Sequence, residues 1–360
     1  QTQNIYLTGS MNSWATENAS YKFSDWDRTS STYVTLLTPS LTASTTYDFK
    51  VITGGVYRGL NSDNTYSANN QTKRLYQGGG SEANVHLTTD VAGRYLFRYD
   101  VSAGKLTIFF PPSMLTASLD SRAITSAVLN VTSTRGTQYH VVDSSNGIDQ
   151  VLTPTSNQIT VTGLTEGTLY TFTVTALDDN NTESSNSITL NPFCTLLETA
   201  PTAPTYEECQ VLSVYSQYYR SLQASFSDWG GGSTKTDSVV DGVNMWEVNV
   251  GTAWSDGGYG IEWGNQTFDI SGYTGLHFDI WTPTATTIYV TPINRNSTYN
   301  GNDTEVRHSG KATTARGWTS VNIPISEFTG EKTRNYQLKI EGNKGNPMFI
   351  TNIFYYKTAA

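Results

Sequence analysis

Residues 275–282 read "GLHFDIWT", and their alternation predicts a β-strand with two different faces. Every second residue from Leu276 to Ile280 is apolar, so this side would form a core stripe. His277, Asp279 and Trp281 would lie together on the other side. A histidine, an acid and a tryptophan on one sheet face suit a sugar-binding surface, and they equally suit a second layer that a loop covers.

Similar runs fill the rest of residues 206–360, which show only strand patterns. In "MWEVNV" and "YGIEW", Trp246 and Trp263 alternate in step with aliphatic residues, which predicts that both are buried. Trp254 and Tyr259 flank the turn "SDGG", and we expect this loop to display both rings. Trp229, in "SDWGGGS", is a further exposed candidate.

The chain divides into three predicted β-sandwiches in tandem, so the expected fold class is all-β. Short alternating runs separated by turn clusters fill residues 1–111, and "FFPPS" ends the last of them because proline has no N–H to donate to a ladder. A second set of strands fills residues 112–192. The stretch "NPFCTLLETAPTAPTYEEC" holds three prolines, which predicts a stiff linker over 193–205 before the third sandwich at 206–360.

Composition supports an exported all-β protein. Aromatic residues make up 12% of the chain and charged residues only 15%, and threonine, tyrosine, phenylalanine and valine favour strands. The net charge of −9 argues against nucleic acid as a partner, because phosphate binding depends on lysine and arginine. The chain has no apolar run long enough to span a bilayer. It begins at Gln1 with no methionine and no hydrophobic leader, so we expect a processed or trimmed mature segment of an exported protein.

The two cysteines, Cys194 and Cys209, bracket the proline-rich stretch. A disulfide between them would close a loop of about 15 residues and would stabilise the fold by about 3 kcal/mol in the chain-entropy model. The alternative is two unpaired thiols. Two cysteines at this spacing without supporting histidines predict no metal site.

Two segments resemble known families of accessory modules. The run "GLTEGTLYTFTVTALDDNNTES" resembles the end of a fibronectin type III module, in which Leu164 and Tyr170 would anchor a corner. The pattern "FDISGYTGLHFDIWTPTATTIYV…RGWTSVNIPISEF…ITNIFYYK" resembles the jelly-roll, carbohydrate-binding-module-like domains of glycan-degrading and glycan-binding proteins of the Bacteroidetes. Such jelly rolls often carry an aspartate that supports a structural calcium where this chain has Thr351, so we expect no cofactor.

The N-terminal segment resembles the early-set β-sandwich modules of the outer-membrane starch-binding proteins of Bacteroides. The resemblance rests on "IYLTGSMNSW", "YDFKV…GGVYRG" and "GGGSEANVHL". It implies a glucan site that contains Lys50, Tyr57 and Asn84.

Trp14 or Trp26 would serve as the second platform of that site, and Arg58 follows Tyr57 in the same glycine-flanked turn. The chemistry agrees, because the apolar face of a pyranose packs on an aromatic ring and its hydroxyls need a few oriented polar groups. The alternative is that Trp14 closes one end of the sandwich and the others are ordinary surface residues.

These features predict a non-catalytic glycan-binding protein. Glycoside hydrolysis needs two carboxylates held across the scissile bond, and the sequence contains no recognisable catalytic motif. A neutral polysaccharide is expected as the ligand, with α-glucan favoured by the N-terminal resemblance.

By resemblance, the protein would be an outer-membrane lipoprotein at the cell surface, anchored by a lipid outside this segment and working beside a transporter and surface hydrolases. Two other functions remain open: an adhesion or scaffold protein without a glycan site, and the ancillary tail of a larger glycoside hydrolase.

Overall fold

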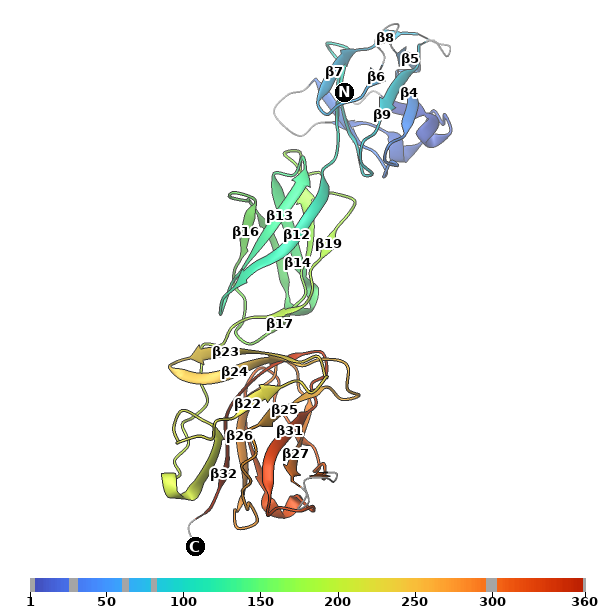
Figure 1. Cartoon of the computed structure of the whole chain (residues 1–360). Helices are drawn as coiled ribbons and strands as arrows, with labels where there is room; N and C mark the ends of the chain where they lie inside the picture. Colours follow the sequence, from blue (N-terminus) through green and yellow to red (C-terminus); the bar gives the residue numbers. More distant parts are fainter. Residues whose placement is uncertain (1–3, 26–31, 60–64, 79–82, 296–302, 359–360) are drawn as a thin grey trace. The chain divides into compact units, whose positions relative to one another are not determined.

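The chain folds almost entirely into β-strands, as the sequence predicts. A computed structural model describes residues 4–25, 32–59, 65–78, 83–295 and 303–358 (Figure 1). These residues form sheets that are antiparallel except where β6 (Thr65–Tyr66) pairs with β9 (Val85–Thr88), joined by turns and three-residue 3-10 helices, with no α-helix in the described ranges. In this part of the chain no helix combines the length and the apolar character that crossing a bilayer requires.

The strands of the N-terminal sandwich are β1 (Ile5–Gly9), β2 (Ser24–Asp25), β3 (Tyr33–Leu37), β4 (Thr46–Thr53), β5 (Val56–Gly59), β6 (Thr65–Tyr66), β7 (Gln71–Arg74), β8 (Tyr76–Gln77), β9 (Val85–Thr88), β10 (Leu96–Asp100) and β11 (Lys105–Phe109). The strands of the middle sandwich are β12 (Ser113–Arg122), β13 (Ala127–Thr134), β14 (Gln138–Asp143), β15 (Ile148–Leu152), β16 (Gln158–Val161), β17 (Leu169–Tyr170), β18 (Thr173–Leu177), β19 (Ile188–Thr189) and β20 (Phe193–Cys194).

The strands of the C-terminal sandwich are β21 (Val211–Tyr215), β22 (Ser225–Ser227), β23 (Thr234–Val240), β24 (Val243–Asn249), β25 (Gly258–Glu262), β26 (Gly275–Trp281), β27 (Thr287–Asn294), β28 (Thr304–Glu305), β29 (Lys311–Ala312), β30 (Trp318–Pro324), β31 (Asn335–Glu341) and β32 (Pro347–Tyr356). The 3-10 helices are η1 (Ser10–Asn12), η2 (Ala19–Tyr21), η4 (Ser144–Asn146), η5 (Glu208–Gln210) and η6 (Ile325–Glu327).

The N-terminal sandwich packs two sheets on one aromatic core. One sheet has the order β6-β9-β4-β5-β8, with β1 paired to β4, and the other has the order β2-β3-β10-β11-β7. Phe49 and Phe97 meet edge to face at 5.4 Å between the sheets. Alternate residues of a strand face opposite sides of the sheet. Because Phe49 points into the core, Lys50 and Ile52 lie on the outer face of β4.

The middle sandwich is built from sheets of order β12-β13-β16 and β15-β14-β18-β19, with β17 and β20 forming a separate pair. Leu164 and Tyr170 are buried, and the Tyr170 hydroxyl accepts a hydrogen bond from the Thr165 N–H at 2.8 Å. The predicted linker 193–205 is only partly a linker, because Phe193 and Cys194 form a strand and Leu197 joins a hydrophobic cluster.

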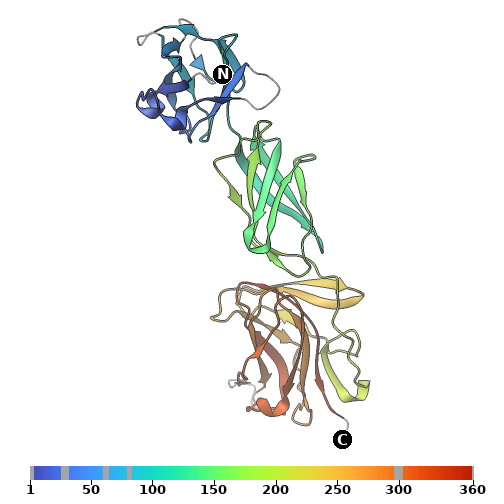
Figure 2. The same ribbon diagram turned by 180° about the vertical axis from the view of Figure 1, so that it is seen from behind.

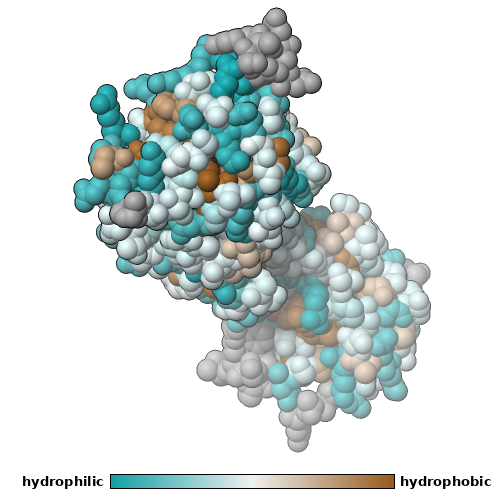
Figure 3. Space-filling model, turned by 90° about the horizontal axis from the view of Figure 1, so that it is seen from below, coloured by the Kyte–Doolittle hydropathy of each residue, from teal (hydrophilic) through white to brown (hydrophobic). Residues whose placement is uncertain are grey.

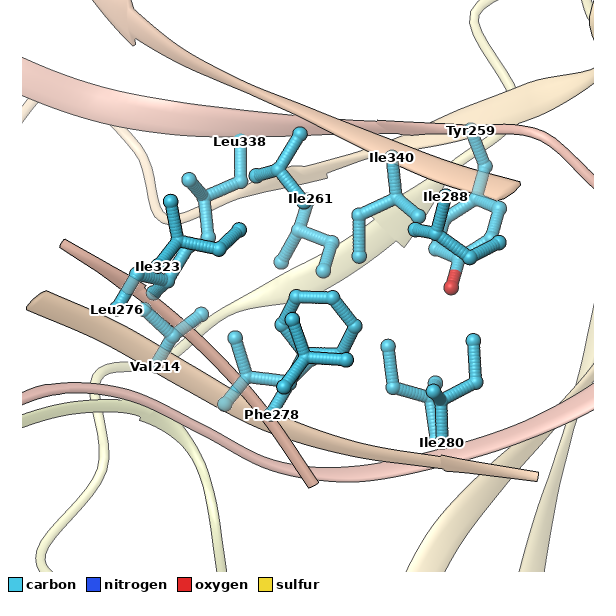
Figure 4. Packing of buried hydrophobic residues seen from close by; sticks show 14 of the residues in the cluster. Val214, Tyr259, Ile261, Leu276, Phe278, Ile280, Ile288, Ile323, Leu338 and Ile340 are labelled. Carbon is cyan, nitrogen blue, oxygen red and sulfur yellow. The ribbon is translucent and has the colours of Figure 1, made fainter. Parts of the chain in front are cut away.

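The C-terminal sandwich has sheets of order β23-β24-β32-β26-β30 and β22-β25-β31-β27-β28; β21 adds to β32 and β29 to β27. Leu276, Phe278 and Ile280 of β26 point into the core, where they meet Ile261 and Leu338 of the facing sheet (Figure 4). The strands of this sandwich are seen from behind in Figure 2. The predicted core stripe of β26 is therefore confirmed, as is the burial of Trp246 and Trp263.

The chain forms two compact units. One unit contains residues 1–121, 127–161 and 171–191, and the other contains residues 122–126, 162–170 and 192–360. The second unit therefore combines the C-terminal sandwich with two loops from the middle of the chain.

Candidate functional site

The outer face of β4 carries a row of side chains that crosses three strands. The antiparallel register places Tyr6 of β1 opposite Ile52, and Ile52 opposite Tyr57 of β5. Directly opposed residues in a sheet point to the same face, so the two tyrosines flank Ile52 on the outside of the sandwich.

This row forms one wall of a hollow of about 510 Å³. Thr16 and Glu17 contribute to the lining, together with the turn Gly54–Gly55 between β4 and β5. Both glycines adopt positive φ, at 56° and 78°, which a two-residue hairpin turn requires at its centre. Neither would meet an atom within 4 Å through an added Cβ, so the rim beside Tyr57 is open.

Lys50 lies beside the Tyr57 ring. Its Nζ is 5.9 Å from the ring centroid, and the residue is only 6% exposed, whereas Tyr57 is 40% exposed. Asn84 lies one position before the Val85–Phe49 pair of β9 and β4, which places its backbone next to that of Lys50. The structure thus places Lys50 between Tyr57 and the backbone of Asn84, while Tyr57 is the one of these three residues that lines the hollow.

The other predicted residues of this module lie elsewhere. Arg58 is opposite Val51, which is buried, so Arg58 faces the inner side of β5, and its Nε donates to Thr53 Oγ1 at 2.5 Å. Trp14 is 41% exposed, which contradicts the alternative that it closes one end of the sandwich; it is not among the residues that line the hollow. Trp26 lies outside the described residues.

A second candidate surface lies on the outer face of the sheet β22-β25-β31-β27-β28, which we call the polar face. Gly258 and Gly260 of β25 point outward here, and two indoles lie over them. A Cβ on Gly260 would be 2.4 Å from ring atoms of Trp229, and one on Gly258 would be 3.1 Å from the Trp254 ring. The glycines in "WSDGGYGIEW" therefore leave room for two half-buried tryptophans.

Charged side chains surround these rings. Lys339 of β31 is opposite Gly260; its Nζ is 5.9 Å from the Trp254 ring centroid and donates to Glu305 at 2.8 Å. The Arg307 guanidinium lies 3.6 Å from the Tyr289 ring centroid and 2.8 Å from Asp256.

A further part of the polar face lies at its other end. The Gln337 amide donates to Glu262 at 3.2 Å. Burial, followed by the hydrogen bond to Asp303, raises the pKa of Tyr336 to about 12, so its hydroxyl stays protonated and can donate.

Sequence reasoning missed most of the polar face. Tyr289, Arg307, Gln337 and Lys339 were not predicted as site residues. Tyr289 could have been found, because it alternates with Ile288 and Val290 in "TIYVTPIN". Lys339 lies near Trp254 because strands β25 and β31, some 80 residues apart in sequence, pair in the sheet, and sequence alternation carries no signal for this pairing.

The prediction that the loop displays Tyr259 is wrong. Tyr259 is 0% exposed, and its hydroxyl donates to Met348 Sδ at 3.3 Å within the core (Figure 4). Tyr259 alternates in step with Ile261 and Trp263. Strand β25 already begins at Gly258, so Tyr259 belongs to the strand and not to the preceding turn. Trp254 is half-buried and lies on the polar face.

The predicted sugar-binding set on β26 is also wrong for Asp279 and Trp281. Trp281 is 5% exposed, donates its indole N–H to the Gly167 carbonyl at 3.0 Å, and packs edge to face on Trp318. Asp279 is 1% exposed and accepts hydrogen bonds from Ser320 and Asn352. The alternative, a second layer that a loop covers, describes this face.

His277 is held within the same layer. Its ring stacks on Phe354 at 4.7 Å, and Nδ1 lies 2.8 Å from Asn322 Oδ1. The stacking on Phe354 and the hydrogen bond with Asn322 hold the His277 ring against the outer face of the sheet.

The two cysteines are not bridged, so the candidate disulfide is a wrong prediction. Cys194 is buried in the cluster that covers Trp281, while Cys209 is exposed, and both are free thiols. Burial raises the pKa of Cys194 to about 12, which keeps it uncharged. In the described ranges no group of three or more histidine, cysteine or acidic residues could hold a metal ion, and Thr351 donates to the Asn244 carbonyl.

Comparison with known proteins identifies no family for this chain. No protein-family model matches it, and no curated protein matches it. Similar solved structures include a chain from a study of the promiscuous specificity of carbohydrate-binding modules of the β-sandwich superfamily. The two sequences are 16% identical, the match covers 69% of this chain and 98% of that chain, and the TM-score is 0.26.

Two further solved structures are carbohydrate-binding modules. The family 11 module of the cellulosomal cellulase Lic26A-Cel5E of Clostridium thermocellum has 18% identity, with 38% of this chain and 86% of that chain covered and a TM-score of 0.28. A family 29 module variant has 16% identity, with 36% and 80% covered and a TM-score of 0.24.

Proposed function

We propose that this protein binds a neutral glycan without cleaving it, and that the hollow beside Tyr57 is its principal site. The observation that carries the proposal is the exposed Tyr57 ring, which lies in one row with Tyr6 and has the Lys50 ammonium beside it. A tyrosine ring offers an apolar face to the C–H groups of a pyranose, and Thr16 and Glu17 in the lining offer polar groups to its hydroxyls.

Binding without hydrolysis is consistent with the groups around the hollow. Glu17 is the one carboxylate among the described residues that line it, whereas glycoside hydrolysis uses a pair of carboxyl groups. On the polar face, Asp256 and Glu305 are each paired with a cation.

The finer parts of the proposal rest on the sequence resemblances. They favour α-glucan as the ligand and an outer-membrane lipoprotein at the cell surface, beside a transporter and surface hydrolases. A scaffold without a glycan site is the competing function, and the burial of Trp281 favours it for that part of the chain.

Affinity electrophoresis in gels that contain amylopectin, pullulan, dextran, xylan, β-glucan, mannan or pectin would test the proposal. We expect retardation by amylopectin or pullulan, and loss of that retardation in Tyr57→Ala. Tyr76→Ala is the matched control, because Tyr76 is also exposed and lies on β8, outside the hollow. If none of the polymers retards the wild type, the glycan-binding function is wrong and the scaffold is favoured.

The polar face would supply a second, weaker contact with a long polymer. Two linked sites raise the apparent affinity because the second contact forms at a high effective concentration. We expect Trp254→Ala to weaken retardation by a long polymer several-fold and to leave the affinity for a short oligosaccharide at the Tyr57 hollow unchanged. Equal loss for both ligands, or no loss for either, would contradict a second contact at Trp254.

A further inference from the structure

The N-terminal sandwich contains another hollow on the inner side of β5. Its volume is about 400 Å³, and it lies where β5 and β7 meet the turn between β10 and β11. Arg58, Arg74, Leu75, Tyr99 and the turn residues 101–104 line it. Because Tyr57 and Arg58 are consecutive residues of β5, they face opposite sides of the strand, and this hollow is separate from the one beside Tyr57.

Two guanidinium groups line this hollow without a carboxylate partner among the described residues. Arg58 Nε donates to Thr53 Oγ1 at 2.5 Å, and the Arg74 guanidinium lies 5.7 Å from the Tyr76 ring centroid. Asp100, at the adjacent turn, is held by its own loop: its Oδ1 accepts from the Ser102 N–H, the Ser102 hydroxyl and the Ala103 N–H at 2.8 to 3.0 Å. The two arginines therefore keep donors available in a chain whose net charge is −9.

The remaining lining of the hollow is mixed. Thr53 and Ser102 are polar, and Val101 is an exposed apolar residue at the edge, while Leu75 and Tyr99 are buried beneath. An inorganic anion would use the guanidinium groups and make no use of the apolar edge at Val101. A sugar residue would use both, because it combines an apolar ring face with polar substituents.

We propose that this hollow binds a sugar residue through an anionic substituent, either the carboxylate of a uronic acid or a sulfate ester. The guanidinium fork matches both groups, since each offers two oxygens to parallel N–H donors. The volume is in the range of sites that hold small ligands. The protein would thus contact neutral residues at the Tyr57 hollow and acidic residues at the Arg58 and Arg74 hollow.

Titration calorimetry of the whole chain at low ionic strength tests the inference. The probes are an oligogalacturonide, a sulfated galactan oligosaccharide, inorganic sulfate and a neutral malto-oligosaccharide. Arg74→Gln removes an exposed guanidinium, and Arg220→Gln is the matched control, because Arg220 is exposed, loses the same charge and lies in the C-terminal sandwich.

We expect an anionic oligosaccharide to bind the wild type and Arg220→Gln equally, and to bind Arg74→Gln at least about tenfold more weakly. Added salt should weaken the same interaction. Arg58→Lys, which keeps the charge and loses the fork, should also weaken it. The oligogalacturonide and the sulfated probe distinguish which of the two substituents is bound.

Three results would overturn the inference: no binding of either anionic oligosaccharide by the wild type, equal binding by Arg74→Gln and the wild type, or inorganic sulfate binding as tightly as the oligosaccharides. The neutral probe separates this inference from the function proposed above. Its binding should depend on Tyr57 and should be the same in Arg74→Gln as in the wild type.

Discussion

Trp281→Ala is expected to lower the free energy of unfolding of the C-terminal sandwich by about 3–5 kcal/mol, the usual cost of removing a large buried aromatic side chain. Trp281 packs with Leu197, Met245 and Phe349 in the cluster that covers the outer face of β26. Its indole N–H also satisfies the Gly167 carbonyl, which would lose this partner in the variant. Urea unfolding followed by circular dichroism measures the change.

Trp254→Ala provides the control for this prediction. Trp254 is half-buried on the polar face, so its removal should cost about 1 kcal/mol. The two variants thus differ in their expected main effect. Trp281→Ala lowers stability strongly and leaves glycan binding unchanged below the unfolding transition, whereas Trp254→Ala lowers stability little and weakens binding to a long polymer. Unchanged stability together with lost glycan binding in Trp281→Ala would show that the tryptophan is a platform and that its burial is wrong.

Arg122→Ala is expected to destabilise the same unit by about 3–5 kcal/mol, because it leaves a buried carboxylate without its partner. The Glu247 side chain is only 5% exposed, and both of its oxygens lie 2.7 Å from nitrogens of the Arg122 guanidinium. The same guanidinium donates to the Cys194 carbonyl at 2.6 Å, so Arg122 holds β20 and β24 together within its own unit.

A second substitution separates the charge from the packing. Combining Arg122→Ala with Glu247→Gln removes the unpaired charge, and we expect part of the lost stability to return in urea unfolding. Lys235→Ala is the control: it breaks a pair with Asp237, whose side chain is 77% exposed, and should cost no more than about 1 kcal/mol. If Arg122→Ala costs no more than Lys235→Ala, the ion pair with Glu247 does not stabilise the fold.

The alternation of apolar residues predicted the strands and the cores because burial on one face imposes a period of two along a strand. Leu276, Phe278 and Ile280 show this directly, as do Trp246 and Trp263. The same reasoning applied one step further along "YGIEW" would have placed Tyr259 in the core.

Sequence alternation alone does not reveal what covers a strand's other face. Trp281 is buried by Gly167 and Leu197, which lie about 80 to 115 residues away in sequence and carry no local signal. The polar face is also formed by residues that are far apart in sequence. Gly260 and Lys339, for example, are neighbours because strands β25 and β31 pair in the sheet. The spacing of the two cysteines likewise did not predict that Cys194 is buried and Cys209 is exposed.

The face of the molecule seen in Figure 3 gives no simple hydropathy signal for a site either. On the face seen in Figure 3, hydrophobic residues are scattered among hydrophilic ones and do not form one continuous patch. Scattered exposed apolar residues are ordinary on protein surfaces.

Titration calorimetry with a soluble malto-oligosaccharide tests most directly whether the Tyr57 ring is the platform for a neutral glycan. The measurement compares the wild type with Tyr57→Phe, Tyr57→Ala and Tyr76→Ala. We predict that Tyr57→Phe and Tyr76→Ala bind within about threefold of the wild type, and that Tyr57→Ala loses at least about tenfold, because the apolar area of the ring is removed. Equal binding by Tyr57→Ala and the wild type, with both folded, would contradict the role of this ring.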